Sequence, residues 1–159
     1  MNDSLILKAV LETHFCPRNA VPETPAAIDG RPGLEVFVIF TGFSSTLAAL
    51  KRADQLTRKL EARVRLLWPY EVPYALSLTN PAVPAKILEE QLRGLASGVP
   101  ISSEGHIYLC RDKLRTLRLI LKPHAIVILG GRKWWWCAER KLARALRKDG
   151  HHVIFTHSG

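Results

Sequence analysis

Glycines, cations and aromatic rings lie together in one short stretch, LGGRKWWWCAERK at residues 129–141. The stretch follows an apolar run and precedes a basic segment with the periodicity of a helix. Backbone N–H groups at glycines and the positive end of a helix dipole are groups that cradle phosphates. The stretch therefore indicates an anion site that contains Gly130, Gly131, Arg132 and Lys133.

Three consecutive tryptophans, Trp134 to Trp136, follow these cations and allow three interpretations. On a helical wheel, Trp135 shares one line with Leu142 and Leu146, which is typical of a residue that packs on a sheet. In the first interpretation the rings only fill space. In the second, Trp134 and Trp136 form stacking surfaces in a ligand pocket beside the anion site. In the third they belong to an interface, because exposed tryptophan is typical of binding hot spots.

The remaining polar residues indicate neither a reaction nor a metal site. His151 and His152 are adjacent, so in a strand they point to opposite faces, and His157 lies six residues after His151. These side chains therefore cannot converge on one metal within one chain. Ser44 and Ser45 are expected to cap a helix, because no base lies near them in the sequence. With no acid–base pair or triad, the sequence predicts a protein that is not an enzyme.

Three cysteines, Cys16, Cys110 and Cys137, are odd in number and form no CxxC pair. This pattern argues against a disulfide scaffold and against a zinc site, so free thiols are expected. Cys137 falls in the first turn of a predicted helix near Lys133. Helix N-termini and cations favour the reactive thiolate form. A redox-sensitive thiol at Cys137 is therefore the alternative to a simple buried cysteine.

The chain has 159 residues, a formal net charge of +9 and 47% hydrophobic residues, which suits one folded domain with a real core. No apolar run approaches the ~20 residues of a membrane-spanning helix. No positive region precedes the apolar segment Leu5–Leu11, so no signal peptide is indicated and a cytoplasmic protein without a membrane association is expected.

Residues 111–149 hold twelve Lys and Arg against three Asp and Glu. This segment is either a solvated surface or an attractor of nucleic acid or another anion.

The first 34 residues differ from the rest of the chain. The apolar segment Leu5–Leu11 is expected to form a helical turn or two. The following stretch, CPRNAVPETPAAIDGRPG, carries four prolines, which block helix interiors. We therefore predict an N-terminal arm or linker at residues 1–34 and an α/β domain at residues 35–159.

Strands and helices alternate after the arm. Runs such as VFVIF and AIVILGG are apolar on both faces, as buried parallel strands are. After such strands, leucines and alanines recur at the spacing of a helix, which indicates helices with one apolar face. The predicted strands cover residues 36–40, 63–68, 100–110, 125–131 and 151–156, and the predicted helices between them include residues 84–98, 111–122 and 134–148.

This alternation predicts an α/β fold with an open five-stranded parallel sheet and helices on both faces. Ligands of such sheets bind beyond the carboxyl ends of the strands, where the strand order reverses. Thr41 and Gly42 follow the first strand, and Gly130 and Gly131 end the fourth. If these two strands are neighbours, their turns flank one crevice, which is the predicted ligand site.

The stretch VFVIFTGFSSTLAALKRADQLTRKLEARVRLLWPYEVP resembles the first β-α-β unit of universal stress protein domains. RLILKPHAIVILGGRK and ERKLARALRKDGHHVIFT resemble their last two strands and last helix. The resemblance covers residues 35–157 and rests on element order and hydrophobic pattern. It implies a strand order of 3-2-1-4-5, a homodimer formed through the last strand, and membership in a family in which some proteins bind ATP. Trp68 falls where the family places the adenine-side wall of its pocket.

Two marks of the ATP-binding members are missing. These members carry an aspartate at the end of the first strand, where this chain has Thr41. Their phosphate loop has the form G-x-x-G-x9-G-[S/T]. Here Gly130 matches the first glycine, but Lys133 replaces the second, and Ala143 and Arg144 occupy the last two positions. Glycines let backbone N–H groups approach phosphates, so the sequence predicts no family-type ATP binding and no resident cofactor.

These patterns favour a non-catalytic stress-response or regulatory module of the universal stress protein type, with an unidentified protein partner. A homodimer is expected because the apolar residues Val153, Ile154 and Phe155 lie on an edge strand. One alternative is nucleic-acid binding through the basic helices at 111–122 and 134–148. The other is a nucleotide- or anion-binding protein with a rebuilt loop, for which ATP is one candidate ligand. Its site contains Thr41, Gly42, Trp68, Gly130, Gly131, Arg132 and Lys133.

Overall fold

Seven strands and four helices make up the described part of the chain. The structure is a computed structural model and describes residues 6–7, 12–15, 33–60, 62–100, 103–133 and 137–158. The elements in chain order are β1 (Ile6–Leu7), β2 (Glu12–Phe15), β3 (Glu35–Ile39), α1 (Phe43–Leu60), β4 (Arg63–Glu71), α2 (Ala85–Ala96), β5 (Ser103–Cys110), α3 (Lys113–Ile120), β6 (Ile126–Gly131), α4 (Ala138–Lys148) and β7 (His152–His157).

One sheet contains all of these strands. Its parallel part has the order β5-β4-β3-β6-β7. Counted from β3 as the first strand, this order is 3-2-1-4-5, so the predicted five-stranded parallel sheet is confirmed. β1 and β2 extend it as antiparallel partners of β5. β3 therefore lies at the centre of the parallel sheet, with β6 on the side where the strand order reverses.

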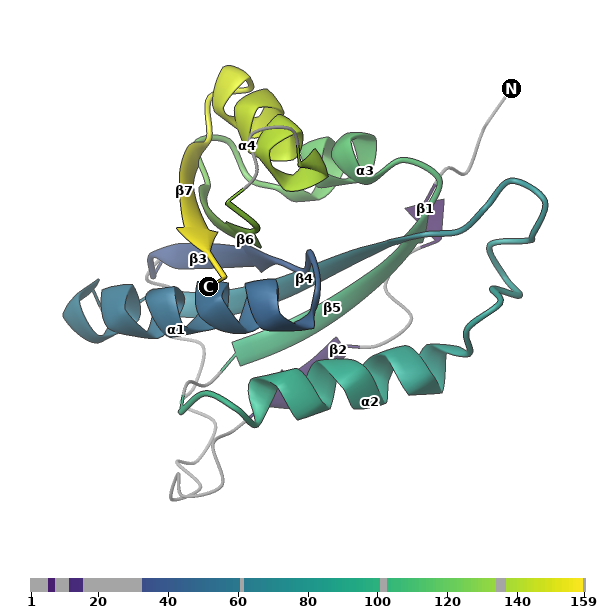
Figure 1. Cartoon of the computed structure of the whole chain (residues 1–159), viewed down its shortest axis with the longest axis horizontal. Helices are drawn as coiled ribbons and strands as arrows, with labels where there is room; N and C mark the ends of the chain where they lie inside the picture. Colours follow the sequence, from purple (N-terminus) through teal and green to yellow (C-terminus); the bar gives the residue numbers. More distant parts are fainter. Residues whose placement is uncertain are drawn as a thin grey trace.

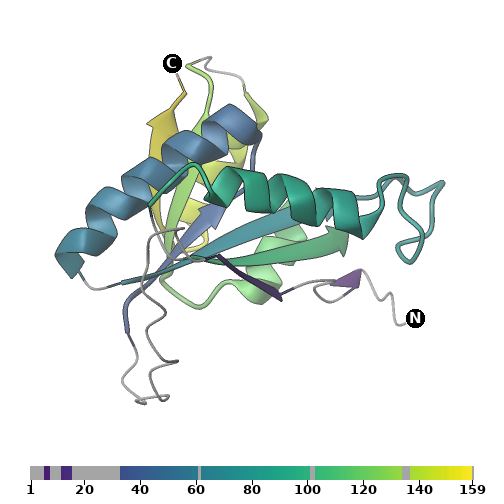
Figure 2. The same ribbon diagram turned by 90° about the horizontal axis from the view of Figure 1, so that it is seen from below.

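Helices cover both faces of the central strands. Figures 1 and 2 show α1 and α2 on one face, with α3 and α4 on the other. Val36 and Val38 of β3 join the hydrophobic cluster under α1 and α2. Phe37 and Ile39 join the cluster under α3 and α4. Because both faces of β3 are buried, its sequence is a continuous apolar run and does not alternate.

The turn between β3 and α1 differs from the sequence-based expectation. The prediction that Ser44 or Ser45 caps the helix is wrong, because α1 begins directly after Gly42 and both serines lie inside its first turn. Gly42 has a φ of +147°, which favours glycine. The side chain that closes this turn is that of Thr46, whose Oγ1 accepts a hydrogen bond from the Thr41 N–H at 3.0 Å.

Helix α1 crosses the end of β6 in direct backbone contact. A Cβ on Gly130 would lie 1.8 Å from the carbonyl oxygen of Ser45 and 2.4 Å from its carbonyl carbon. Only glycine permits so close an approach. The Thr41 hydroxyl donates a hydrogen bond to the Gly130 carbonyl at 2.7 Å, so the turn after β3 is joined to β6 at the same position.

The described pieces of the N-terminal arm are strands. The predicted helical turn at Leu5–Leu11 is wrong where the structure describes it, because Ile6–Leu7 forms β1 and pairs with Leu109 and Cys110 of β5. β2 pairs with residues 103–106 of the same strand. These pieces therefore extend the sheet at its β5 edge. The division of the chain into an arm at 1–34 and a domain at 35–159 stays a prediction.

Strand β4 is longer than predicted. The sequence indicates a loop after Trp68, yet β4 continues through Pro69 to Glu71. β3 ends at Ile39, opposite Leu67, so the last residues of β4 pair only with β5 in the described sheet. A proline, which has no N–H, is tolerated on such an edge.

The other three helices occupy most of their predicted ranges. Asp112 caps α3, and its carboxylate accepts a hydrogen bond from the Arg115 N–H at 2.8 Å. The predicted start of the last helix at Trp134 falls outside the described residues, and α4 is described from Ala138. None of the helices that the structure describes is long and apolar enough to cross a membrane.

The substitution Gly130→Ala tests the contact between α1 and β6. The added methyl group would collide with the backbone of Ser45, which cannot rotate away as a flexible side chain can. Overpacking an interior costs about 1–3 kcal/mol. We expect a loss at the upper end of that range, about 3 kcal/mol of unfolding free energy, measured by urea denaturation.

A matched control is Gly94→Ala. Gly94 is exposed within α2, and a Cβ there would meet nothing within 4 Å. Alanine is more favourable than glycine inside a helix by about 1 kcal/mol, so this variant should gain stability. Equal stability of Gly130→Ala and the wild type would show that α1 does not rest on β6 as described.

Candidate functional site

The turns after β3 and β6 lie side by side at the carboxyl edge of the sheet. β3 pairs with β6 in parallel, from Val36 opposite Ile126 to Ile39 opposite Leu129. The two strands that carry glycine-containing turns are therefore neighbours, as the crevice prediction requires. Strand order reverses between them, which is the position at which open α/β sheets bind ligands.

A cavity of about 550 Å³ opens between these turns. The first turn of a helix has N–H groups without helical partners and carries the positive end of the helix dipole. In this cavity the first turn of α1 faces the segment that joins β6 to α4. The exposed Arg132 adds a full positive charge, and Glu139 is the one carboxylate in the described lining. The lining residues are Thr41, Gly42, Phe43, Ser44, Ser45, Arg132, Cys137 and Glu139.

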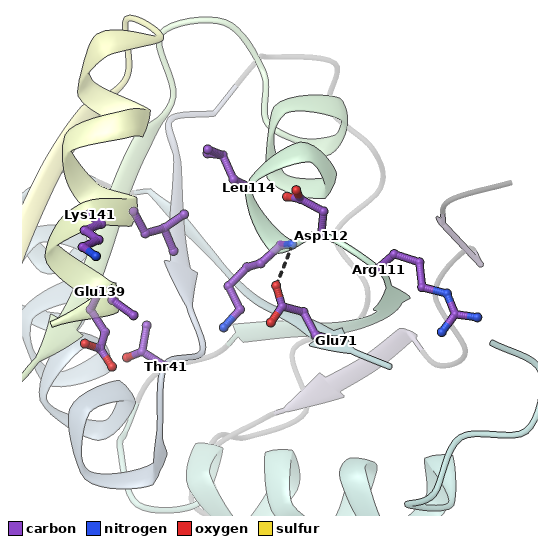
Figure 3. A pocket seen from close by; sticks show the side chains of 10 residues that line it. Thr41, Glu71, Arg111, Asp112, Leu114, Glu139 and Lys141 are labelled. Atoms are coloured by element: carbon purple, nitrogen blue, oxygen red, sulfur yellow. Dashed lines mark hydrogen bonds between the residues drawn. The ribbon is translucent and has the colours of Figure 1, made fainter. Parts of the chain in front are cut away.

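A second cavity of about 420 Å³ adjoins the first, and Figure 3 shows its lining. Thr41 and Glu139 line both cavities. Arg111 also belongs to the lining, but in Figure 3 its guanidinium points away from the other side chains. It donates hydrogen bonds to the carbonyls of Val72 at 2.9 Å and Leu76 at 2.7 Å. Arg111 therefore holds the loop after β4 and leaves the cavity to the remaining charged groups.

Those remaining groups have mixed charge. Glu71 accepts a hydrogen bond from the backbone N–H of Lys113 at 3.0 Å (dashed in Figure 3), and Asp112 is occupied as the cap of α3. The ammonium groups of Lys113 and Lys141 form no ion pair with any residue that the structure describes. Two cations are thus available to an anionic ligand in this cavity.

The sequence-based site did not include the charged residues of the second cavity. It missed Glu71 because β4 was predicted to end at Trp68, three residues earlier. It missed Asp112, Lys113 and Lys141 because the basic helices were considered as surfaces for nucleic acid, and their first turns were not considered as part of the crevice. Their position directly after strands, or in the first turn of a helix on the same edge, was the signal that could have found them.

Several predicted site residues serve packing in the structure. Trp68 is 7% exposed and stacks on Phe40 with ring centroids 4.0 Å apart, in the cluster under α1 and α2. It lines neither of the two cavities. A Cβ on Gly131 would lie 2.5 Å from the Phe155 ring, so that glycine admits an aromatic side chain. Lys133 is exposed and lies outside both linings.

The tryptophan cluster falls on residues that the structure does not describe. Trp134, Trp135 and Trp136 lie in the gap between residues 133 and 137. The interpretations of these rings as packing, as a ligand pocket or as an interface therefore stay predictions.

The histidines near β7 have structural partners. His151 accepts a hydrogen bond from the Ala125 N–H through Nδ1 at 3.3 Å. Nδ1 of His124 lies 3.2 Å from the Gly150 carbonyl oxygen. Within the described ranges, no group of three or more His, Cys, Asp or Glu side chains could hold a metal ion.

The fold is that of universal stress proteins, as comparison with solved structures shows. The chain is similar to the crystal structure of a universal stress protein in complex with cAMP, with a TM-score of 0.51 and 15% sequence identity. The match covers 80% of this chain and 98% of that one. By sequence, the chain matches no protein-family model and no curated protein. At this level of identity, the likeness establishes the arrangement of the elements and leaves the ligand open.

The two described cysteines differ in their surroundings. Cys110 is fully buried at the end of β5, and burial raises the pKa of its thiol, while a hydrogen bond with Thr116 acts in the opposite direction. Cys137 is half-buried and lines the first cavity, with its Sγ 3.8 Å from the Arg132 carbonyl oxygen. Both thiols are free.

We expect iodoacetamide to label Cys137 of the native protein at pH 8 well before Cys110. The thiolate is the reacting species, and burial of Cys110 both limits access to its thiol and raises the pKa of that thiol, which lowers its thiolate fraction. Peptide mass spectrometry after short labelling measures the two sites separately. Unfolding in urea should remove the difference. Equal labelling rates in the native protein would contradict the burial of Cys110.

Proposed function

We propose that the chain is a non-catalytic regulatory module of the universal stress protein type that binds a small phosphate-bearing ligand in the crevice between β3 and β6. The observation that carries this proposal is a pair of adjoining cavities at the carboxyl edge of the sheet. The first lies where the strand order reverses, and the second extends from it to the ends of β4 and β5. Arg132, Lys113 and Lys141 give the crevice three cations beside a helix N-terminus. The similar solved structure contains cAMP, so nucleotides are the first ligands to test.

The mode of binding would differ from the glycine loop of the family's ATP-binding members. Gly130 packs against the backbone of Ser45, and Gly131 packs against the Phe155 ring. The Thr41 hydroxyl, at the position of the family's aspartate, is bound to the Gly130 carbonyl. These glycines therefore serve packing, and the anion affinity would rest on side-chain cations and the start of α1.

A non-catalytic role agrees with the side chains around the crevice. The Ser45 hydroxyl shares a hydrogen bond with the Ser158 hydroxyl at 3.1 Å and has no histidine beside it in the described lining. The carboxylate of Asp112 is used as a helix cap. In this proposal the bound ligand changes how the module meets a protein partner in the cytoplasm.

Titration with magnesium-ATP and with cAMP, followed by calorimetry and tryptophan emission, tests the crevice. We expect saturable binding with a micromolar dissociation constant. Arg132→Gln and Lys113→Gln should each raise that constant about tenfold, because a hydrogen bond to a charged group contributes about 1.5–3 kcal/mol. Both side chains line the crevice, Arg132 in the first cavity and Lys113 in the second.

The matched control is Arg52→Gln, which removes the same charge from an exposed position of α1 outside both linings. Its affinity should equal that of the wild type. Absence of heat and of any spectral change at millimolar concentrations of both nucleotides would contradict ligand binding in the crevice. The module would then act through protein contacts alone.

A homodimer formed through β7 is a second part of the proposal. In the described sheet β7 pairs only with β6. The N–H groups of His152 and Ser158 donate to the carbonyls of Ala125 and Gly131, at the two ends of β6. Successive residues of a strand direct their backbone groups to opposite sides. The backbone groups of Val153, Phe155 and His157 therefore lie on the side without a partner strand in the described sheet. A strand with such a free side invites pairing with a second chain. The apolar side chains of β7 are half-buried.

The substitution Val153→Pro tests this edge. It removes an N–H from the free side and leaves the pairing with β6 intact, which is the one orientation in which a strand tolerates proline. Light scattering should give the mass of two chains for the wild type and of one chain for the variant, with unchanged circular dichroism. A one-chain mass of the wild type over a wide concentration range would refute the dimer.

A further inference from the structure

Three arginines of α4 gather beside β7, on a surface separate from the crevice. Arg140, Arg144 and Arg147 are spaced by four and three residues, so they lie on one face of the helix. Together with Phe155 and His157 they line a hollow of about 150 Å³. No carboxylate belongs to its described lining. The hollow is smaller than the roughly 300 Å³ at which pockets for whole organic ligands begin, so it suits a single chemical group.

Some helix arginines of this protein form ion pairs, and others, Arg52 and Arg115 among them, form none with a described residue. Arg58, Arg93 and Arg118 each pair with a carboxylate, at 2.9, 2.8 and 2.7 Å respectively. By contrast, the three arginines of the hollow form no ion pair with a described residue. Like charges at this spacing on a helix repel one another. An anion in the hollow would remove that repulsion.

Two of the guanidinium groups are held in place. Arg140 lies over the Phe155 ring, 5.1 Å from its centroid, and its buried Nε has no hydrogen-bond partner among the described residues. Arg147 donates to the Val153 carbonyl from Nη2 at 3.0 Å and from Nε at 3.4 Å, and its Nη1 group has no partner in the described part of the chain. Arg144 is exposed between them. Fixed donors of this kind bind an oxyanion with little loss of side-chain freedom.

We propose that this hollow binds a phosphate group, held by Arg140, Arg144 and Arg147. Guanidinium groups match the geometry of phosphate oxygens and pair with them in a bidentate manner. Arg140, whose side chain lines the hollow, supplies a donor for one oxygen, and the Nη1 group of Arg147 supplies another. The phosphate comes either from a free small anion or from the backbone of a single-stranded nucleic acid. This site is independent of the crevice and of any ligand bound there.

Titration of the full chain with inorganic phosphate in chloride buffer of constant ionic strength tests the site. The readouts are calorimetry and the NMR signal of the Arg140 Nε–H group, assigned with Arg140→Gln. We expect saturable binding and a shift of that signal. Arg144→Gln, at an exposed position that folding does not require, should weaken binding about tenfold, and Arg140→Gln combined with Arg144→Gln about a hundredfold.

Two controls separate this site from others. Arg52→Gln removes one positive charge from α1, on the opposite face of the sheet from α4 (Figure 1), and should leave phosphate binding unchanged. Arg132→Gln changes the crevice, which by the proposed function also binds phosphate, so its control readout is the Arg140 Nε–H signal, which should shift with phosphate as in the wild type. Weaker nucleotide binding by Arg132→Gln, with an unchanged response of the hollow to phosphate, would thus concern only the proposal for the crevice. Absence of saturable phosphate binding, or equal binding by the wild type and the double variant, would overturn the proposal.

A labelled single-stranded oligonucleotide distinguishes the two sources of phosphate. Anisotropy should rise with protein concentration, and inorganic phosphate should compete, if the group belongs to a nucleic acid. Affinity should then fall steeply with salt, because each phosphate contact releases a counterion. Binding of inorganic phosphate without any binding of the oligonucleotide would assign the hollow to a free anion, and the proposal of a phosphate site would stand.

Discussion

The contact between the first turn of α1 and Gly130 is the constraint on which the functional edge depends. At this point two backbones meet with no side chain between them. The contact brings the start of α1 over the end of β6, while the Thr41 hydroxyl joins the turn after β3 to the same residue. The start of α1 and the turn after β3 are therefore both joined to the same residue of β6 at the crevice. A larger residue at Gly130 would lift the helix and separate the groups that line the first cavity.

Charge is distributed differently in the crevice and in the hollow beside β7. The crevice mixes Lys113, Lys141 and Arg132 with Glu71 and Glu139, so it can complement a ligand that has both anionic and hydrogen-bonding groups. The hollow beside β7 contains arginines and no carboxylate in its described lining, which suits an oxyanion alone. Helix α4 contributes to both sites, because Glu139 and Lys141 line the crevice and the three arginines line the hollow.

The edge strand β7 connects these features. On one face, Phe155 packs against Gly131 and beneath Arg140, so the same ring shapes the end of β6 and orients a cation of the hollow. On its free side, the Val153 carbonyl already accepts hydrogen bonds from Arg147. Pairing of two copies along this edge and anion binding in the hollow would therefore involve neighbouring groups, and each would change the electrostatic surroundings of the other.

The sequence was enough to predict the alternation of strands and helices, because burial on both faces requires continuous apolar runs such as Val36–Ile39 and leaves a periodic stripe on each helix. With the family resemblance it also predicted the strand order and the neighbouring turns at Thr41 and Gly130. What those turns contact depends on the packing of the folded chain. Whether Gly130 faces a ligand or the backbone of Ser45 depends on how α1 crosses β6, and the residue type is the same in both cases. Likewise, the charged lining at Glu71 and Lys113 follows from where β4 ends. β4 extends to Glu71 because its last residues pair with Ile107–Cys110 of β5, a pairing that the local sequence does not show.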